Sequence, residues 1–214
     1  MFLGGVDKLF PLIQDGFPEL GLVKENCIEM SWVESVLYFG GVSRKRLDIL
    51  LYRNALPNLF FKGKSDYVKE PIPESGFEGI WSKFFEKEAE ASFMMMVAFG
   101  GKMDAIPETE LPYSHRVGNL FQTSYLVGWT KDENAESQKY ISWIRRLYSY
   151  MTTYVSESTR EAYFNYRDLD IGTNNNGYTS YAQASIWGLK YFKNNFNRLV
   201  QAKTMVDPEN FFQK

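Results

Sequence analysis

The alternation within residues 120–129 constrains the fold more than any other feature of this sequence. The β-forming residues Phe121, Thr123, Tyr125, Val127 and Trp129 recur at every second position, as in a β-strand with one buried face. The opposite face would carry two small polar side chains, Gln122 and Ser124, near the start of the strand. A pocket wall and an exposed part of a sheet would both show this pattern, so both interpretations stay open.

Further strands and helices are predicted from the same kind of periodicity. Residues 60–68 alternate, and residues 92–98 form a continuous apolar run that suits a central strand covered on both faces. Residues 29–33 also predict a short strand. Apolar stripes at helical spacing predict helices near residues 6–17, 77–85, 141–155 and 182–200, with others over 43–56 and from Asp207-Pro208 onward. This order predicts an α+β fold, a mostly antiparallel sheet with helices covering one face.

Charge and composition exclude several function classes. The 24 basic and 26 acidic residues are mixed along the chain and give a net charge of −2, which argues against a nucleic-acid partner. Cys27 is the single cysteine and His115 the single histidine, so the sequence predicts no internal disulfide and no metal site of the multi-histidine or cysteine kind. We expect His115 to be structural rather than a catalytic base.

The sequence predicts neither a signal peptide nor a membrane segment. The first seven residues, MFLGGVD, lack both the basic leader and the long apolar core of a secretory signal. The longest apolar run, residues 93–99, is much shorter than the roughly 20 residues that a helix needs to cross a bilayer.

A dense group of polar side chains marks residues 163–170 as a candidate site. Two phenols, an amide, a guanidinium and two carboxylates fall within eight residues, before a loop rich in glycine and asparagine. A structural interpretation is also available, in which Arg167 pairs with Asp168 or Asp170 while the tyrosines bury their rings. From the residue types alone, that structural interpretation carries more weight than catalysis.

Several short sequence motifs, taken together, favour a functional site over the structural interpretation. The chain resembles the plant berberine bridge enzyme-like FAD-linked oxidoreductases, the family of reticuline oxidase and the cannabinoid synthases. The resemblance is carried by the strings at residues 165–170, 186–188, 190–192, 195–200 and 207–212, and upstream by those at 2–5, 29–32, 64–68, 99–101 and 115–116. It extends over essentially the whole chain but covers only the C-terminal half of a family member.

The resemblance implies a division of labour along the chain. Residues 1–162 would form a substrate-binding α+β domain, whose sheet lies over a flavin held by a separate N-terminal domain. Residues 163–214 would form a C-terminal segment that packs on that flavin domain. FAD would be bound mainly by the missing N-terminal domain, so we expect this chain alone to be inactive. The family is secreted, to the cell wall, apoplast or vacuole.

The resemblance also implies roles for individual residues. Tyr166 would be the catalytic base, while Asn165 and Tyr163 would contact the flavin and Val97 would line the substrate pocket. On the strand at 120–129, family members carry a lysine that stabilises the tyrosinate, or a glutamate.

This sequence departs from the family at those strand positions, because Gln122 and Ser124 stand there. Neither side chain supplies a positive charge, whereas a free tyrosine titrates only near about 10. Three explanations of this departure stay open: Tyr166 acts with weaker assistance, the substrate differs, or the catalytic function has been lost.

Two functional hypotheses follow. In the first, the chain is the substrate-binding half of an FAD-dependent oxidase that oxidises a small plant metabolite or carbohydrate with dioxygen as electron acceptor. Its partners would be the small-molecule substrate, dioxygen and the N-terminal FAD domain of the same protein. The alternative is a non-catalytic truncated fragment or binding module that does not hold FAD by itself.

Overall fold

The computed structural model describes residues 2–41, 47–52, 59–156, 159–175, 178–209 and 211. The chain divides into two compact units, Met1–Pro57 and Asn58–Lys214. The division expected at residue 162 concerns which segment contacts a flavin domain, and it stays a prediction. In the described residues, no helix is both long and apolar enough to cross a membrane.

The first unit is helical. Its described residues form α1 (Val6–Gly16), α2 (Trp32–Phe39) and short 3-10 helices at Pro18–Leu20, Lys24–Asn26 and Leu47–Leu51. The helix predicted near residues 6–17 is confirmed by α1. Of the helix predicted over 43–56, residues 47–51 form the third of these 3-10 helices, and residues 43–46 and 53–56 lie outside the described part.

The short strand predicted at residues 29–33 is wrong, because α2 begins at Trp32. The hydroxyl of Ser31 accepts a hydrogen bond from the Glu34 backbone N–H at 3.3 Å, and the Glu34 carboxylate accepts from the Ser31 N–H at 2.7 Å. This reciprocal capping box satisfies backbone donors that a helix start leaves unpaired. Local capping therefore starts a helix where the apolar pattern alone suggested a strand.

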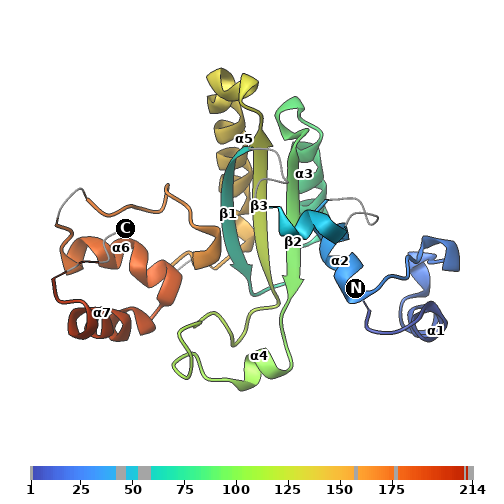
Figure 1. Ribbon diagram of the computed structural model, residues 1–214, viewed down its shortest axis with the longest axis horizontal. Coiled ribbons are helices and arrows are strands. Elements are labelled where there is room, and N and C mark those ends of the chain that lie inside the picture. The colour runs from blue at the N-terminus through green and yellow to red at the C-terminus, as the bar shows by residue number, and fades with distance from the viewer. Residues whose placement is uncertain are drawn as a thin grey trace. The chain divides into compact units, whose positions relative to one another are not determined.

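The second unit is built on an antiparallel sheet of three strands, in the order β1–β3–β2 (Figure 1). The strands are β1 (Phe60–Val68), β2 (Ser92–Ala98) and β3 (Phe121–Trp129), so all three predicted segments are confirmed as strands. The central position expected for β2 is wrong. Within the described residues β2 pairs with β3 alone, and side chains such as Val97 are 42% exposed.

Helices cover one face of this sheet, as the predicted α+β class requires. Figure 1 shows α3 (Glu74–Phe84) and α5 (Ser137–Tyr150) on the same side of the strands. Burial of apolar side chains between the two layers supplies the main stabilising term. The core joins Tyr125, Val127 and Trp129 of β3 to Ile80, Trp143, Ile144 and Leu147 of the helices.

The last predicted helix is interrupted. Residues 182–200 belong to two helices, α6 (Tyr181–Phe192) and α7 (Asn195–Val206), with Lys193 between them at φ +49°. The apolar stripe continues across the break because both helices pack on each other, with the Phe196 ring against Gly188. A Cβ atom at Gly188 would lie 2.2 Å from that ring.

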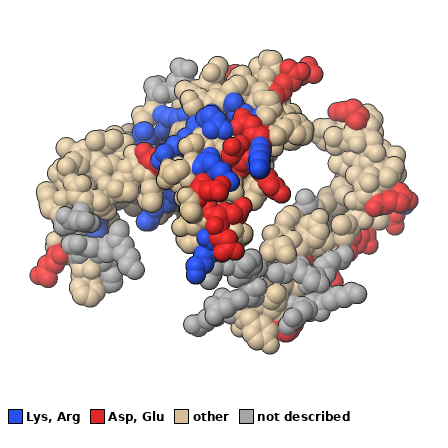
Figure 2. Space-filling model, turned by 90° about the horizontal axis from the view of Figure 1, so that it is seen from above, with Lys and Arg blue, Asp and Glu red and all other residues tan. Residues whose placement is uncertain are grey.

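Two further short helices belong to the second unit. α5 continues into a 3-10 helix at Met151–Tyr154, and α4 (Lys102–Ala105) lies in the long connection between β2 and β3. The helix expected from Asp207 onward is a turn at residues 208–209, and residues 210 and 212–214 lie outside the described part. On the face seen in Figure 2, acidic and basic side chains lie next to one another, so no continuous field of one sign forms there.

Candidate functional site

The face of the sheet opposite α3 and α5, here called the open face, carries no charged side chain from the three strands. Paired residues of neighbouring antiparallel strands point to the same face of the sheet, and successive residues of one strand point to opposite faces. The strand pairing therefore assigns each strand side chain to one of the two faces. The open face comprises Phe61, Gly63, Ser65 and Tyr67 of β1, Phe93, Met95 and Val97 of β2, and Gln122, Ser124, Leu126 and Gly128 of β3. Lys62, Lys64 and Asp66 of β1 all lie on the helix face.

Three predicted site residues meet on the open face. Val97 is the cross-strand partner of Gln122, and Ser124 is the partner of Met95 on β2. Gln122 is only 6% exposed, and its amide nitrogen has no hydrogen-bond partner in the described residues. Leaving a buried N–H unpaired costs about 1–3 kcal/mol, so an acceptor for this amide would be stabilising.

The turn predicted as the catalytic segment crosses the outer edge of β1. It is a 3-10 helix at Phe164–Tyr166. Before it, the Tyr163 backbone N–H donates to the Ser65 hydroxyl at 2.7 Å, on the open face. After it, the Asp168 carboxylate accepts from Lys64 at 2.6 Å, on the helix face. The turn is therefore fixed on both sides of one strand.

The three predicted residues of this turn lie together. Tyr166 packs edge-to-face on Tyr163 with ring centres 5.3 Å apart, and the Asn165 amide donates to the Tyr163 hydroxyl at 2.7 Å. The Tyr163 ring in turn packs against Tyr113 at 5.7 Å, and the Tyr113 hydroxyl lies 3.1 Å from that of Tyr67. Through these contacts Tyr166 belongs to an aromatic group that reaches the open face.

Gln122 is the cross-strand partner of Tyr67, so the orphaned amide stands beside this aromatic group. Burial raises the pKa of Tyr113 to about 12 and that of Tyr67 further still, so both phenols stay neutral at physiological pH. They can donate hydrogen bonds but do not act as bases. Within the described residues, no hydrogen bond is formed by the Tyr166 hydroxyl.

The expected pairing of Arg167 with a neighbouring aspartate is wrong. The Arg167 guanidinium lies over the Phe164 ring, 5.1 Å from its centre. Asp168 and Asp170 instead pair with cations from distant segments, Lys62 and Lys64 of β1 and Arg145 of α5. The Arg145 hydrogen bond, supported by those from the lysines, holds the pKa of Asp170 well below its usual range against the effect of burial.

His115 is buried among partners that fit a structural role. Its Nδ1 lies 2.7 Å from the Glu161 carboxylate, its Nε2 lies 2.7 Å from the Tyr191 carbonyl oxygen, and its ring stacks on Tyr67 at 4.3 Å. Burial alone would raise the pKa of Glu161, but the His115 hydrogen bond and charge, with Lys193 and Lys69, lower it to about 2. In the described residues, no three acidic, histidine or cysteine side chains gather to hold a metal ion.

Sequence reasoning missed the residues that anchor the turn, namely Lys62, Lys64, Ser65 and Arg145. The alternation of residues 60–68 placed both lysines on one face, but nothing in the sequence pointed to carboxylates about a hundred positions away.

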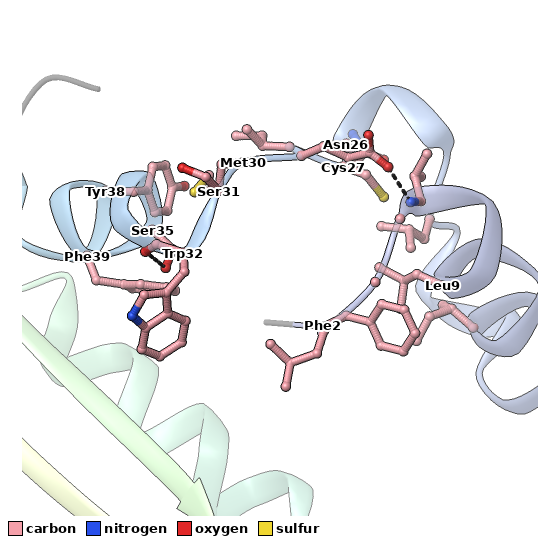
Figure 3. A pocket seen from close by; sticks show the side chains of 18 residues that line it. Phe2, Leu9, Asn26, Cys27, Met30, Ser31, Trp32, Ser35, Tyr38 and Phe39 are labelled. Atoms are coloured by element: carbon pink, nitrogen blue, oxygen red, sulfur yellow. Dashed lines mark hydrogen bonds between the residues drawn. The ribbon is translucent and has the colours of Figure 1, made fainter. Parts of the chain in front are cut away.

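The first unit has a hollow of its own that was also not predicted. It encloses about 870 Å³ and is lined mainly by apolar side chains, with Phe2 and Leu9 on one side and Trp32 and Phe39 of α2 on the other (Figure 3). Trp32 is 66% and Phe39 70% exposed, so this unit buries little of its own apolar surface.

Comparisons with known proteins agree with this geometry. The family model "Berberine and berberine like" matches residues 162–214. Berberine bridge enzyme-like 23 of Arabidopsis thaliana is 49% identical over 213 residues, which are 99% of this chain and 40% of that protein. A tetrahydroberberine oxidase of Berberis wilsoniae is 46% identical over 215 residues, 99% of this chain and 40% of that protein.

A solved structure shows the same architecture. The structure of berberine bridge enzyme-like 28 from Arabidopsis thaliana superimposes with a TM-score of 0.91 at 44% identity, covering 100% of this chain and 44% of that one. This chain thus spans about 40% of the length of the curated relatives it matches. The family model, the sequence identity and the fold agree: the chain belongs to the berberine bridge enzyme-like family of FAD-linked oxidoreductases.

Proposed function

We propose that this chain is the substrate-binding part of an FAD-dependent oxidase that oxidises a small plant metabolite, with dioxygen as the electron acceptor. The observation that carries the proposal is the orphaned Gln122 amide on an uncharged face, beside the aromatic group that contains Tyr166. The flavin would be bound mainly by an N-terminal domain of the full-length protein.

The residues present fit a flavin. An uncharged face with exposed apolar side chains and an unpaired amide suits a planar ring that carries hydrogen-bonding edges. Asn165 and Tyr163 would hold one edge of that ring, and the Gln122 amide would donate either to the ring or to the substrate. When bound, FAD supplies the hydride acceptor, while the protein supplies position and electrostatics.

The Tyr166 side chain would act as a base in its phenolate form: its phenol first gives up its own proton, and the phenolate oxygen then takes the proton that leaves the substrate. No Lys, Arg or His hydrogen-bonds that phenol in the described residues, so help in stabilising the phenolate would come from the flavin or its domain. Gln122 and Ser124 cannot replace the lysine or glutamate of other family members, and they would instead orient the substrate through hydrogen bonds.

The lining of the open face favours an aromatic metabolite over a carbohydrate. Phe61 is 66%, Met95 39% and Val97 42% exposed, and these side chains offer apolar contact but no hydrogen bond. A sugar needs several convergent polar groups, whereas a ring compound is held mainly by apolar surface. A relative that is 46% identical is named a tetrahydroberberine oxidase, which places an alkaloid among the first substrates to test.

The test is flavin reduction in the full-length protein that carries this segment. Tyr166→Phe removes the proton acceptor and should lower the rate of flavin reduction by about 10²–10⁴-fold. Tyr181→Phe is a matched control, because Tyr181 is an α6 tyrosine bonded to Asn197 and outside the site. Unchanged turnover in Tyr166→Phe would remove Tyr166 from the mechanism.

The alternative of a non-catalytic fragment or binding module gives a different result. The 214-residue chain purified alone should show no flavin absorbance, because the flavin would be held mainly by other sequence. Tightly bound FAD in that preparation would contradict the proposed division of labour. A folded full-length protein whose flavin no candidate substrate reduces would favour the binding module.

A further inference from the structure

We propose that Lys64 and Ser65, neighbours on β1, are positioning residues that together fix the turn carrying Tyr166. We call this pair the β1 clamp. The inference rests on the proposed role of Tyr166 and adds residues to which no function has been assigned. It concerns how the turn is held, not which substrate it meets.

The clamp depends on strand geometry. Successive residues of a strand point to opposite faces, so Ser65 points to the open face and Lys64 to the helix face. The Ser65 hydroxyl accepts from the Tyr163 N–H at 2.7 Å, and the Lys64 ammonium donates to Asp168 at 2.6 Å. The two ends of the turn are thus held on opposite sides of the β1 edge.

The Lys64 half of the clamp is deeply buried. Lys64 is 2% and Asp168 1% exposed, and the ammonium also lies 4.3 Å from the centre of the Tyr148 ring. A second contact, from Lys64 to Asp170 at 2.9 Å, extends the pairing beyond the turn. Buried ion pairs of this kind depend on geometry, because either charge left alone would be strongly destabilised.

The Ser65 half is a single hydrogen bond, and it lies next to the site. Ser65 is the cross-strand partner of Ser124, on the same face as Gln122. Within the turn, the Tyr166 N–H donates to the Tyr163 carbonyl at 3.0 Å, so a shift of Tyr163 moves Tyr166 with it. Because the Tyr166 hydroxyl forms no bond of its own in the described part of the chain, the anchors at the two ends determine where the phenol lies.

The experiment uses the full-length protein and two readouts. Hydrogen exchange measured on a peptide spanning residues 163–168 reports the turn directly, and steady-state kinetics separate kcat from KM. Ser65→Ala should raise exchange in this peptide at least tenfold and lower kcat about tenfold, with KM changed less than threefold. Ser65→Thr keeps the hydroxyl and should restore both values. Lys64→Met removes the other half of the clamp and should act in the same direction.

Matched controls separate positioning from general stability. Ser92→Ala removes a β2 hydroxyl that donates to the Ala89 carbonyl, and Ile144→Val loosens the core under the helix face. Neither should change exchange in the 163–168 peptide.

The clamp is refuted if Ser65→Ala leaves both hydrogen exchange in the 163–168 peptide and kcat unchanged. It is also refuted if Ile144→Val lowers the melting temperature as much as Ser65→Ala does and lowers kcat by the same factor, because general loss of stability would then explain the effect. If exchange responds as expected while Tyr166→Phe keeps full turnover, the clamp stands and the proposed function fails.

Discussion

Replacing Asp168 by Asn is the most direct test of the ionic anchor under the turn. Asp168 is 1% exposed and accepts from Lys62 at 2.7 Å and from Lys64 at 2.6 Å. Removing one partner of a buried ion pair costs about 3–5 kcal/mol, because the remaining charge stays buried. Asp170 still faces both lysines, at 3.2 and 2.9 Å, so we expect the lower end, about 3 kcal/mol.

A loss of this size is readily measured. For a folded unit of this length, 1 kcal/mol shifts the melting temperature by about 2–4 °C, so Asp168→Asn should melt about 6–12 °C lower. Urea unfolding followed by circular dichroism gives the free energy of unfolding directly. The control is Asp7→Asn. The Asp7 side chain is 84% exposed where it pairs with Lys24, so this substitution should leave the melting temperature nearly unchanged. A loss below about 1 kcal/mol in Asp168→Asn would refute the anchor.

Two further predictions concern buried polar groups. The carboxyl of Glu161 has a pKa of about 2 in the folded chain against an ordinary value of 4.5, so its stabilising contribution is complete above about pH 4.5 and is lost as the pH falls towards 2. Urea midpoints measured across that window should fall less steeply in Glu161→Gln, and an unchanged slope would contradict the assignment. Gln122→Leu removes the orphaned amide, so the 214-residue chain should become more stable by about 1 kcal/mol while the full-length protein turns over more slowly. Lower stability would contradict the unpaired state of the amide, and unchanged turnover would show that it serves neither substrate nor flavin.

Strand periodicity predicted β1 and β3 well because each of these strands has two unlike faces. The pattern of Phe121 to Trp129 assigned both faces of β3, and its two small polar positions did fall on the open face. Periodicity does not say which strands are neighbours, so the edge position of β2 could not be read from its apolar run. A continuous apolar segment describes equally a buried strand and one that exposes its side chains.

The remaining errors have local causes. The strand predicted at residues 29–33 is wrong because the Ser31–Glu34 capping box starts a helix there. The helix predicted over residues 182–200 is two helices, because their shared apolar stripe gives no sign of the break at Lys193. In the candidate site, the resemblance supplied the turn residues, whereas the partners of Asp168 could not be found. Those partners are about a hundred positions away, and they meet only because the turn crosses the β1 edge.

The order of charged and uncharged side chains along β1 also guards against mispairing during folding. If β1 slipped by one residue against β3, every side chain would change faces, because the period of a strand is two. Lys62, Lys64 and Asp66 would then enter the uncharged side of the sheet, while Asp168 and Asp170 would lose their ammonium partners in the same event. A slip by one residue therefore fails on both sides of the sheet at once, because it moves charges onto the uncharged face and separates Asp168 and Asp170 from their lysines.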